Sequence, residues 1–156
     1  MAGNWRAIVA SALDWEQAHA TFDAAVKDLP AALRGRRPRN FPHSVWDIVE
    51  HIRLAQEDLL DFMTNPRYVA PAWPDDYWPK SPAPPTRTAW AKSLKAIRRD
   101  CRKLQKLTQK RSLDLTRRIP WGQGQTYLRT ILVVLDHTSY HTAQIVDVRR
   151  LHADWG

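Results

Sequence analysis

The sequence predicts an all-α fold, a four-helix bundle with up-down-down-up topology, and two observations support this prediction. Apolar residues recur at the 3.6-residue period of a helix in four stretches, 5–29, 44–64, 88–110 and 126–151. Between the second and third stretches, residues 65–85 hold seven of the eleven prolines and show no period. A crossover of this length can run the height of the bundle, so the third helix can lie parallel to the second.

The first stretch carries a stripe of residues spaced alternately by four and three positions, and Pro30 ends it. His19 is the polar member of this stripe. A histidine on an apolar face is commonly a core residue with a hydrogen-bond partner, and contact with a bound ligand is the alternative. The stripe consists of Ile8, Ala12, Trp15, His19, Phe22, Val26 and Leu29.

The second stretch has clear helix boundaries. Ser44 and Asp47 have the spacing of a capping box, and the Asn-Pro pair at 65–66 is a stop signal. His51 lies on the edge of the apolar stripe of this helix, so its imidazole is expected to face the interior of the bundle. His43, directly before the cap, is expected to be an exposed loop residue.

The crossover at 65–85 contains four aromatic residues, Tyr68, Trp73, Tyr77 and Trp78. Four large side chains in one loop would form an exposed apolar patch unless they pack over the bundle. A loop placed there can form the wall of a pocket, although plain packing against the helices explains the same residues. We expect Trp73, Tyr77 and Trp78 to line such a pocket.

The third stretch has an apolar face and a strongly basic face. Residues 92–118 contain eleven Lys and Arg against two Asp, whereas the rest of the chain is nearly balanced in charge. A basic helix face without interleaved aromatic residues is typical of a solvated surface and is weak evidence for nucleic-acid binding. Cys101 belongs to the apolar face, so it is expected to be a small core residue rather than a nucleophile. The basic face of the helix consists of Lys92, Lys95, Arg98, Arg99, Arg102, Lys103, Lys106 and Lys110.

The fourth stretch places two histidines one helical turn apart on its buried side. His137 and His141 are (i, i+4) neighbours, so both imidazoles are expected to point inward and can hold one metal ion. His51 is the candidate for a third ligand from the second helix. Three neutral imidazoles can bind Zn²⁺, Ni²⁺, Fe²⁺ or Mn²⁺ and leave coordination positions open for water or a substrate.

Two other kinds of metal site are excluded. A ferritin-like di-iron site requires Glu-x-x-His motifs, whereas Ile48 and Val134 stand three residues before His51 and His137. A zincin protease requires the motif His-Glu-x-x-His, whereas Thr138 follows His137. No serine or cysteine is paired with a base in a recognisable catalytic motif.

The composition places the chain among ordinary globular proteins. Its 156 residues are expected to form one domain, 1–156, and the formal net charge is +8. One cysteine excludes an internal disulfide, and the first residues lack the pattern of a secretory signal. No apolar run approaches the length of a membrane span. These features predict a soluble cytoplasmic protein with no membrane partner.

Three segments carry a family resemblance, and they read PHSVWDIVEHIRLAQEDLLDF, APAWPDDYWPKSPAPP and GQGQTYLRTILVVLDHTSYHTAQIVDVRRL. Together they resemble the DinB/YfiT-like metalloenzymes over nearly the whole chain. The resemblance implies a four-helix bundle in which His51, His137 and His141 bind a divalent metal ion. Relatives often have histidine where this chain has Trp121 and glycine where it has Ala143, so a role of that loop histidine does not carry over.

The resemblance also implies a class of function. Characterised relatives include transferases that use low-molecular-weight thiols and a thiol-dependent isomerase. The chain is therefore expected to be a metal-dependent S-transferase, or a related thiol-handling enzyme, in which the metal lowers the pKa of the thiol. The alternatives are a metal- or small-ligand-binding bundle without catalysis and a basic nucleic-acid-associated protein.

The open face of the metal ion is expected to lie in a pocket bounded by the first, second and fourth helices. His19, Trp73, Tyr77 and Trp78 are the candidate walls, and a small-molecule substrate is the expected occupant. The three histidines lie on the flanks of their apolar stripes, which places the ion toward one side of the core. The resemblance and the eight tryptophans also predict a homodimer.

Overall fold

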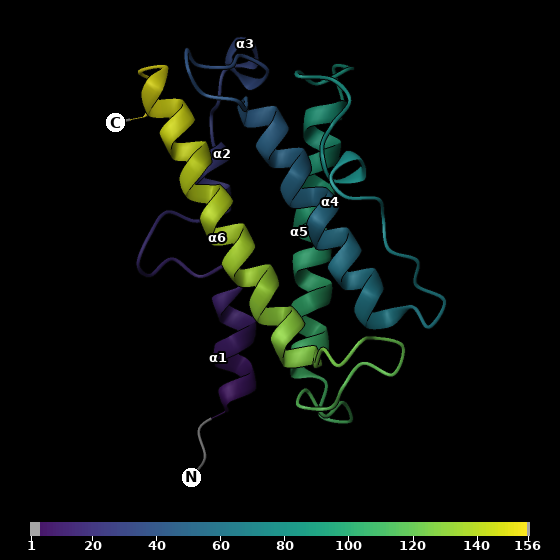
Figure 1. The fold of residues 1–156 in the computed structure, drawn as a ribbon. Coiled ribbons are helices and arrows are strands. Elements are labelled where there is room, and N and C mark those ends of the chain that lie inside the picture. The colour runs from purple at the N-terminus through teal and green to yellow at the C-terminus, as the bar shows by residue number, and fades with distance from the viewer. Residues whose placement is uncertain (1–3, 156) are drawn as a thin grey trace.

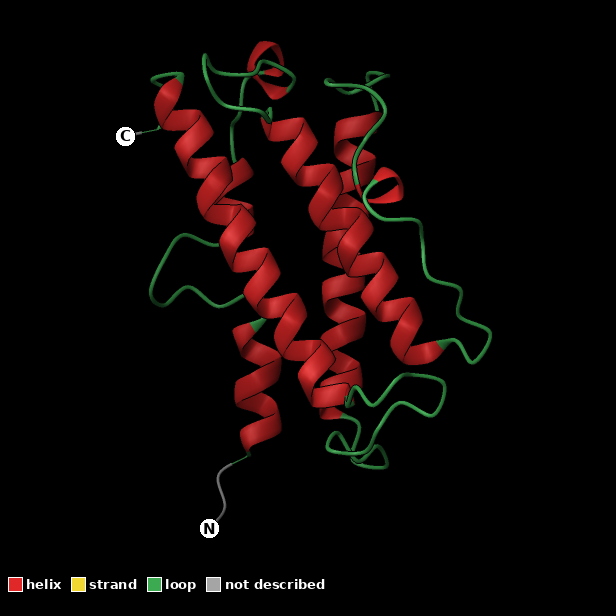
Figure 2. Cartoon of the chain, in the orientation of Figure 1, coloured by secondary structure: helices red, strands yellow, loops and turns green. Residues whose placement is uncertain are grey.

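The computed structural model describes residues 4–155, and the described residues form helices and loops without a β-strand (Figures 1 and 2). Three helices are long, and the others have eight residues or fewer. The elements in chain order are α1 (Trp5–Ala12), α2 (Phe22–Val26), α3 (Ala31–Arg34), α4 (Val45–Thr64), the 3₁₀ turn η1 (Asp75–Tyr77), α5 (Ala89–Gln109) and α6 (Tyr127–Leu151).

The three long helices begin and end close to the predicted residues. Ser44 and Asp47 form both hydrogen bonds of a capping box at the start of α4, and Asn65 follows its last turn. The side chain of Thr126 accepts a hydrogen bond from the backbone N–H of Arg129 and caps α6. The local capping signals of the sequence therefore determine where α4 and α6 begin.

The helices run in two opposite directions in Figure 1, in which α1 and α6 rise while α4 and α5 descend. The segment between α4 and α5 returns along the outside of α4, with η1 on its way. This path agrees with the crossover expected at 65–85. It places aromatic side chains of the crossover beside the middle of α4.

The prediction of one continuous helix over 5–29 is wrong. α1 ends at Ala12, and the chain becomes helical again only at Phe22, where Thr21 caps α2 by accepting a hydrogen bond from Ala24 N–H. Trp15 and His19, which were expected to face the core, are exposed in the connection between the two helices. The alternating spacing of apolar residues thus extends over two short helices and the connection between them. The spacing alone does not make a continuous helix, because most of the stability of a helix comes from tertiary packing.

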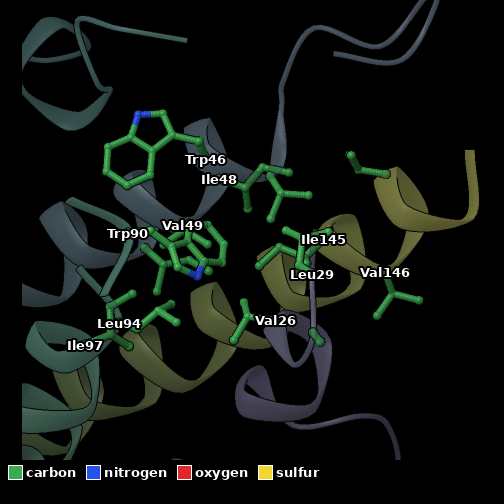
Figure 3. Packing of buried hydrophobic residues seen from close by; sticks show 14 residues of the cluster. Val26, Leu29, Trp46, Ile48, Val49, Trp90, Leu94, Ile97, Ile145 and Val146 are labelled. Carbon is green, nitrogen blue, oxygen red and sulfur yellow. The ribbon is translucent and has the colours of Figure 1, made fainter. Parts of the chain in front are cut away.

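The buried apolar residues form two clusters at different heights of the molecule. One cluster joins α2, α4, α5 and α6 and contains Trp46, Trp90 and Ile145 (Figure 3). The other contains Leu104 on α5 and Ile131 on α6. Between these clusters, α4 and α6 carry polar residues that are nevertheless buried, namely His51, Gln56, His141 and Thr142. The middle level of the molecule is therefore where function is to be sought.

None of the helices in the described part of the chain combines the length and the apolar character that crossing a lipid bilayer requires.

Candidate metal centre

The three predicted histidines meet in space. His51 comes from α4, and His137 and His141 come from successive turns of α6. One ring nitrogen of each lies within 4.8 Å of the others, and His51 and His141 are buried. His51 and His137 are 86 residues apart in sequence, so the packing of α4 against α6 brings the ligands together.

Hydrogen bonds orient two of the three imidazoles. Nδ1 of His51 lies 2.8 Å from the backbone oxygen of Tyr77, and Nδ1 of His141 lies 2.7 Å from Oε1 of Gln144. Both partners are acceptors, so each Nδ1 carries the hydrogen and each Nε2 presents a lone pair. A carbonyl acceptor on the second ring nitrogen is the arrangement that commonly orients a metal-binding histidine.

The spacing of the nitrogens fits a single ion. Nε2 of His51 lies 3.0 Å from Nε2 of His137. Two imidazole nitrogens on one tetrahedral zinc ion stand about 3.3 Å apart, so this pair has to separate by only a few tenths of an ångström. The three nitrogens of the cluster all lie within 4.8 Å of one another. A set of three imidazoles suits Zn²⁺, Fe²⁺ or Ni²⁺ better than Ca²⁺ or Mg²⁺, which prefer oxygen ligands.

Burial keeps all three imidazoles neutral. It lowers the pKa of His137 to about 4, with further contributions from His141 and His51. Burial also lowers the pKa of His51 and that of His141, in each case against the opposing effect of the hydrogen bond that the ring donates to Tyr77 or Gln144. The neutral form is the one that binds a metal, so no proton has to be displaced from the rings at pH 7.

The crossover covers one side of the cluster with aromatic side chains. The indole of Trp78 stacks on the ring of His51, with centroids 4.0 Å apart and an angle of 1° between the planes. His43 stacks on Trp78 with centroids 4.3 Å apart. The indole of Trp78 therefore lies close to the rings of both His43 and His51. This stacking fixes the plane of the His51 ring.

A carboxylate attaches the crossover to α4. Asp58 accepts hydrogen bonds from the hydroxyls of Tyr68 and Tyr77, each at 2.7 Å. Burial, followed by the hydrogen bond to Asp58, raises the pKa of both phenols, so both remain donors at neutral pH. Tyr77 is thus held at two points, through its hydroxyl by Asp58 and through its backbone oxygen by His51.

The histidines lie in a groove of about 670 Å³ between α4, α6 and the crossover, which we call the metal groove. Its walls include Asp58, Trp73, Tyr77, Trp78 and Tyr140. The groove has the size of a small-molecule site, and its mixture of apolar walls with a few convergent polar groups is typical of one. The cluster is therefore accessible from outside the bundle.

A comparison with protein-family models decides what kind of protein this is. The model of the DinB superfamily matches residues 14–145, which is most of the chain. The chain belongs to the DinB superfamily. No curated protein and no solved structure matches it.

In this DinB-superfamily protein the structure brings together most, but not all, of the predicted site residues. Trp73, Tyr77 and Trp78 line the metal groove together with the three histidines. His19 does not, because it is exposed, forms a hydrogen bond with the backbone oxygen of Ala20 and lines a different cavity. The expected boundary by the first helix is also wrong, since no residue of α1 lines the metal groove.

Trp121, the loop position at which the family resemblance implied a histidine, packs as a structural residue. Its indole N–H donates a 2.7 Å hydrogen bond to the backbone oxygen of Phe62 at the end of α4. It does not line the metal groove. The loop before α6 therefore supplies no ligand to the site in the described structure.

Sequence reasoning missed His43 and Asp58. His43 was expected to be exposed but is half-buried against Trp78, and only the fold reveals this contact because the two residues are far apart in sequence. Asp58 could have been found, since it lies seven residues after His51 and thus two turns along the same side of α4. The sequence signal for Asp58 was a carboxylate on the same side of the helix as the candidate ligand His51.

Proposed function

We propose that this protein binds a divalent metal ion through His51, His137 and His141 and uses it in a reaction of a small thiol. The observation that carries the proposal is the convergence of three neutral imidazole nitrogens at an open groove. A divalent ion held there keeps open coordination positions and acts as a Lewis acid that lowers the pKa of a bound thiol or water.

The residues of the chain supply orientation and shape. Tyr77 and Gln144 hold His51 and His141 with Nε2 toward the common centre, and Trp78 fixes the plane of His51. Trp73 and Tyr140 present exposed aromatic surface on the groove, against which the apolar part of an electrophilic substrate can pack. In the proposed S-transfer the S–H bond of the thiol breaks and its proton leaves to solvent, while the sulfur forms a bond to an electrophilic carbon of that substrate. The bond from this carbon to a leaving group breaks, and the leaving group departs with the electron pair.

Metal content is the first test of this proposal. Protein purified without a metal-affinity tag is expected to contain one divalent ion per chain by elemental analysis, and His141→Ala is expected to lose it. His19→Ala is the matched control because His19 lies outside the cluster, and it should keep the metal. In cobalt-substituted protein, adding glutathione or cysteine should change the visible spectrum, and no such change should occur in His141→Ala.

A metal site without catalysis is the second candidate, because neither carboxylate that lines the groove is both shielded from solvent and free of hydrogen-bond donors. Asp58 already accepts two phenol hydrogen bonds, and Asp136 is exposed. Turnover of monochlorobimane with several small thiols separates the candidates. Metal-loaded protein that is no faster than His141→Ala would favour a binding role.

We infer that the basic face of α5 provides solubility rather than nucleic-acid recognition. Its eight Lys and Arg side chains are exposed, and ion pairs with Asp23 and Asp100 occupy several of them. DNA binding should be weak and should fall steeply with salt. A preference for one DNA sequence at physiological salt would contradict this inference.

We propose that the protein is a homodimer. Exposed apolar side chains occur on α1 at Trp5 and Ile8 and on α6 at Leu132, Val133 and Tyr140. Such side chains are compatible with a helix-packed interface between two copies. Light scattering at micromolar concentration should give twice the mass of the chain, and a monomer there would contradict the proposal.

A further inference from the structure

A second cavity lies on the opposite side of α4 and α6 from the histidines. It has a volume of about 390 Å³ and is lined by the α1–α2 connection, α4, α5 and α6. We call it the inner cavity. Its size is within the range of small-molecule sites.

Neighbouring residues of the same helices face the two sites. Ala55, His137 and His141 line the metal groove, and the next residue in each case lines the inner cavity. Successive residues of a helix point about 100° apart, so one helix can present different side chains to two separate sites. The residues on the inner side are Gln56, Thr138 and Thr142.

Two buried oxygens on the inner cavity lack a hydrogen-bond partner among residues 4–155. Thr142 is 3% exposed, and its hydroxyl forms no hydrogen bond with another described residue. By contrast, the buried hydroxyls of Thr108 and Thr130 donate to backbone oxygens one turn earlier. Gln56 is 4% exposed and donates through Nε2 to the backbone oxygen of Ile97, but its Oε1 accepts no hydrogen bond from the described residues.

Oε1 of Gln56 and the hydroxyl oxygen of Thr142 face the cavity and are not enclosed by packed protein. In residues 4–155, Nε of Arg34 is the one fully enclosed side-chain nitrogen or oxygen that lacks a hydrogen-bond partner. The oxygens of Gln56 and Thr142 are therefore not enclosed, and both residues line the inner cavity. A polar group in this position gains stability when a molecule in the cavity supplies the missing hydrogen bond.

The other walls favour an uncharged molecule with an apolar body. Phe22, Ile97 and Leu135 supply apolar surface. The charged residues of the lining are all exposed, and Arg98 is paired with Asp23 at 2.8 Å. They are Asp14, Asp23, Arg98 and Arg102. Burial raises the pKa of the Cys101 thiol to about 12, so this wall is neutral at pH 7. The buried part of the lining, which includes Gln56, Ile97 and Thr142, therefore carries no charge to match an ionic ligand.

We propose that the inner cavity is a binding site for a small uncharged ring compound that carries a hydroxyl group. The hydroxyl donates to Oε1 of Gln56 and accepts from the hydroxyl of Thr142, while the ring packs against Phe22, Ile97 and Leu135. The site is separate from the metal groove, and binding there requires no metal. The proposal goes beyond the thiol reaction and does not depend on it.

The test uses p-cresol and toluene as a matched pair of probes, measured by saturation-transfer NMR and titration with the full-length, metal-loaded protein. The protein should bind p-cresol more tightly than toluene, because only p-cresol supplies the hydroxyl. Thr142→Val should weaken p-cresol binding about five- to tenfold and leave toluene binding unchanged. Thr130→Val, a matched change in the same helix at a hydroxyl that is already bonded, should change neither.

Two further measurements separate this site from the metal groove. Leu135→Phe fills the inner cavity and should abolish binding of both probes, whereas removal of the metal with a chelator should not affect it. Equal p-cresol affinity in wild type and Thr142→Val would overturn the proposal, because the probe would then bind elsewhere. No p-cresol binding in the millimolar range would also overturn it and would assign the cavity to water. Metal content measured in each variant shows whether the metal site is intact.

Discussion

The metal groove and the inner cavity are two polar regions at the same level of one helix pair, and they differ in how their polar groups are satisfied. In the metal groove, His51 and His141 each have an acceptor within the protein, Tyr77 and Gln144. In the inner cavity, Thr142 and Oε1 of Gln56 have none among the described residues. Buried polar groups normally have partners, so the chain itself preorganises the metal groove, whereas the inner cavity leaves two oxygens open to the molecule that we propose binds there.

The two regions also depend on different loops. The crossover supplies Tyr77 and Trp78 to the metal groove and is attached to α4 through Asp58. The α1–α2 connection covers the inner cavity and contains the exposed residues Trp15 and His19. The imidazole of His51 is thus fixed by a hydrogen bond to Tyr77 and by stacking on Trp78. In the α1–α2 connection, by contrast, the side chains of Trp15 and His19 are exposed.

The largest expected effect is loss of the metal from the preorganised region. His137→Ala removes one of three ligands, and it should lose stoichiometric metal while its circular dichroism spectrum remains helical. Elemental analysis of the purified variant measures this. Full metal retention in His137→Ala would contradict the assignment of the three-histidine site.

The second effect concerns the neutrality of the inner cavity. The pKa of Cys101 is raised to about 12, so the thiolate is scarce at neutral pH and increases only as the pH approaches that value. Alkylation of the folded protein by iodoacetamide at pH 8 should be at least about a hundredfold slower than that of the unfolded chain. Mass spectrometry over time gives both rates. Equal rates in the folded and unfolded protein would mean that burial does not raise the pKa of the Cys101 thiol.

The third effect tests the attachment of the crossover. Asp58→Asn removes the negative charge that strengthens the hydrogen bonds from Tyr68 and Tyr77. Tyr77 is then held less firmly, and its backbone oxygen is the acceptor that orients His51. Metal affinity should fall about tenfold, as measured by competition with a chelator of known affinity. Asp136→Asn is the matched control, because Asp136 is exposed in the same groove and accepts no side-chain hydrogen bond among the described residues. An equal loss in both variants would point to a general charge effect.

The smallest effect compares two threonines of α6. Thr130→Val removes a hydroxyl that is bonded to Thr126, so the free energy of unfolding should fall by about 1 kcal/mol. Thr142→Val removes a buried hydroxyl without a protein partner, so the free energy of unfolding should stay the same or rise by up to about 1 kcal/mol. Urea denaturation of both variants measures the difference. A larger loss in Thr142→Val would show that its hydroxyl is satisfied.

Much of the helical framework and the histidine cluster could be predicted from the sequence, because both depend on local spacing. The capping box at Ser44 and the stop at Asn65 determine α4, and both are confirmed. His137 and His141 share a face because they are four residues apart, whatever the rest of the fold does. The basic side of α5 is exposed for the same reason, since its period alone places it opposite the apolar stripe.

Tertiary structure alone decided the contacts between segments that are distant in sequence. The break between Ala12 and Phe22 could not be read from the period, because apolar residues at helical spacing do not reveal whether a packing partner exists. The stacking of His43 on Trp78 and the bond from His51 to Tyr77 depend on the path of the crossover. The inner cavity arises only where α5, α6 and the α1–α2 connection leave space beside Gln56 and Thr142, because packing, unlike helix period, is a property of all the segments together.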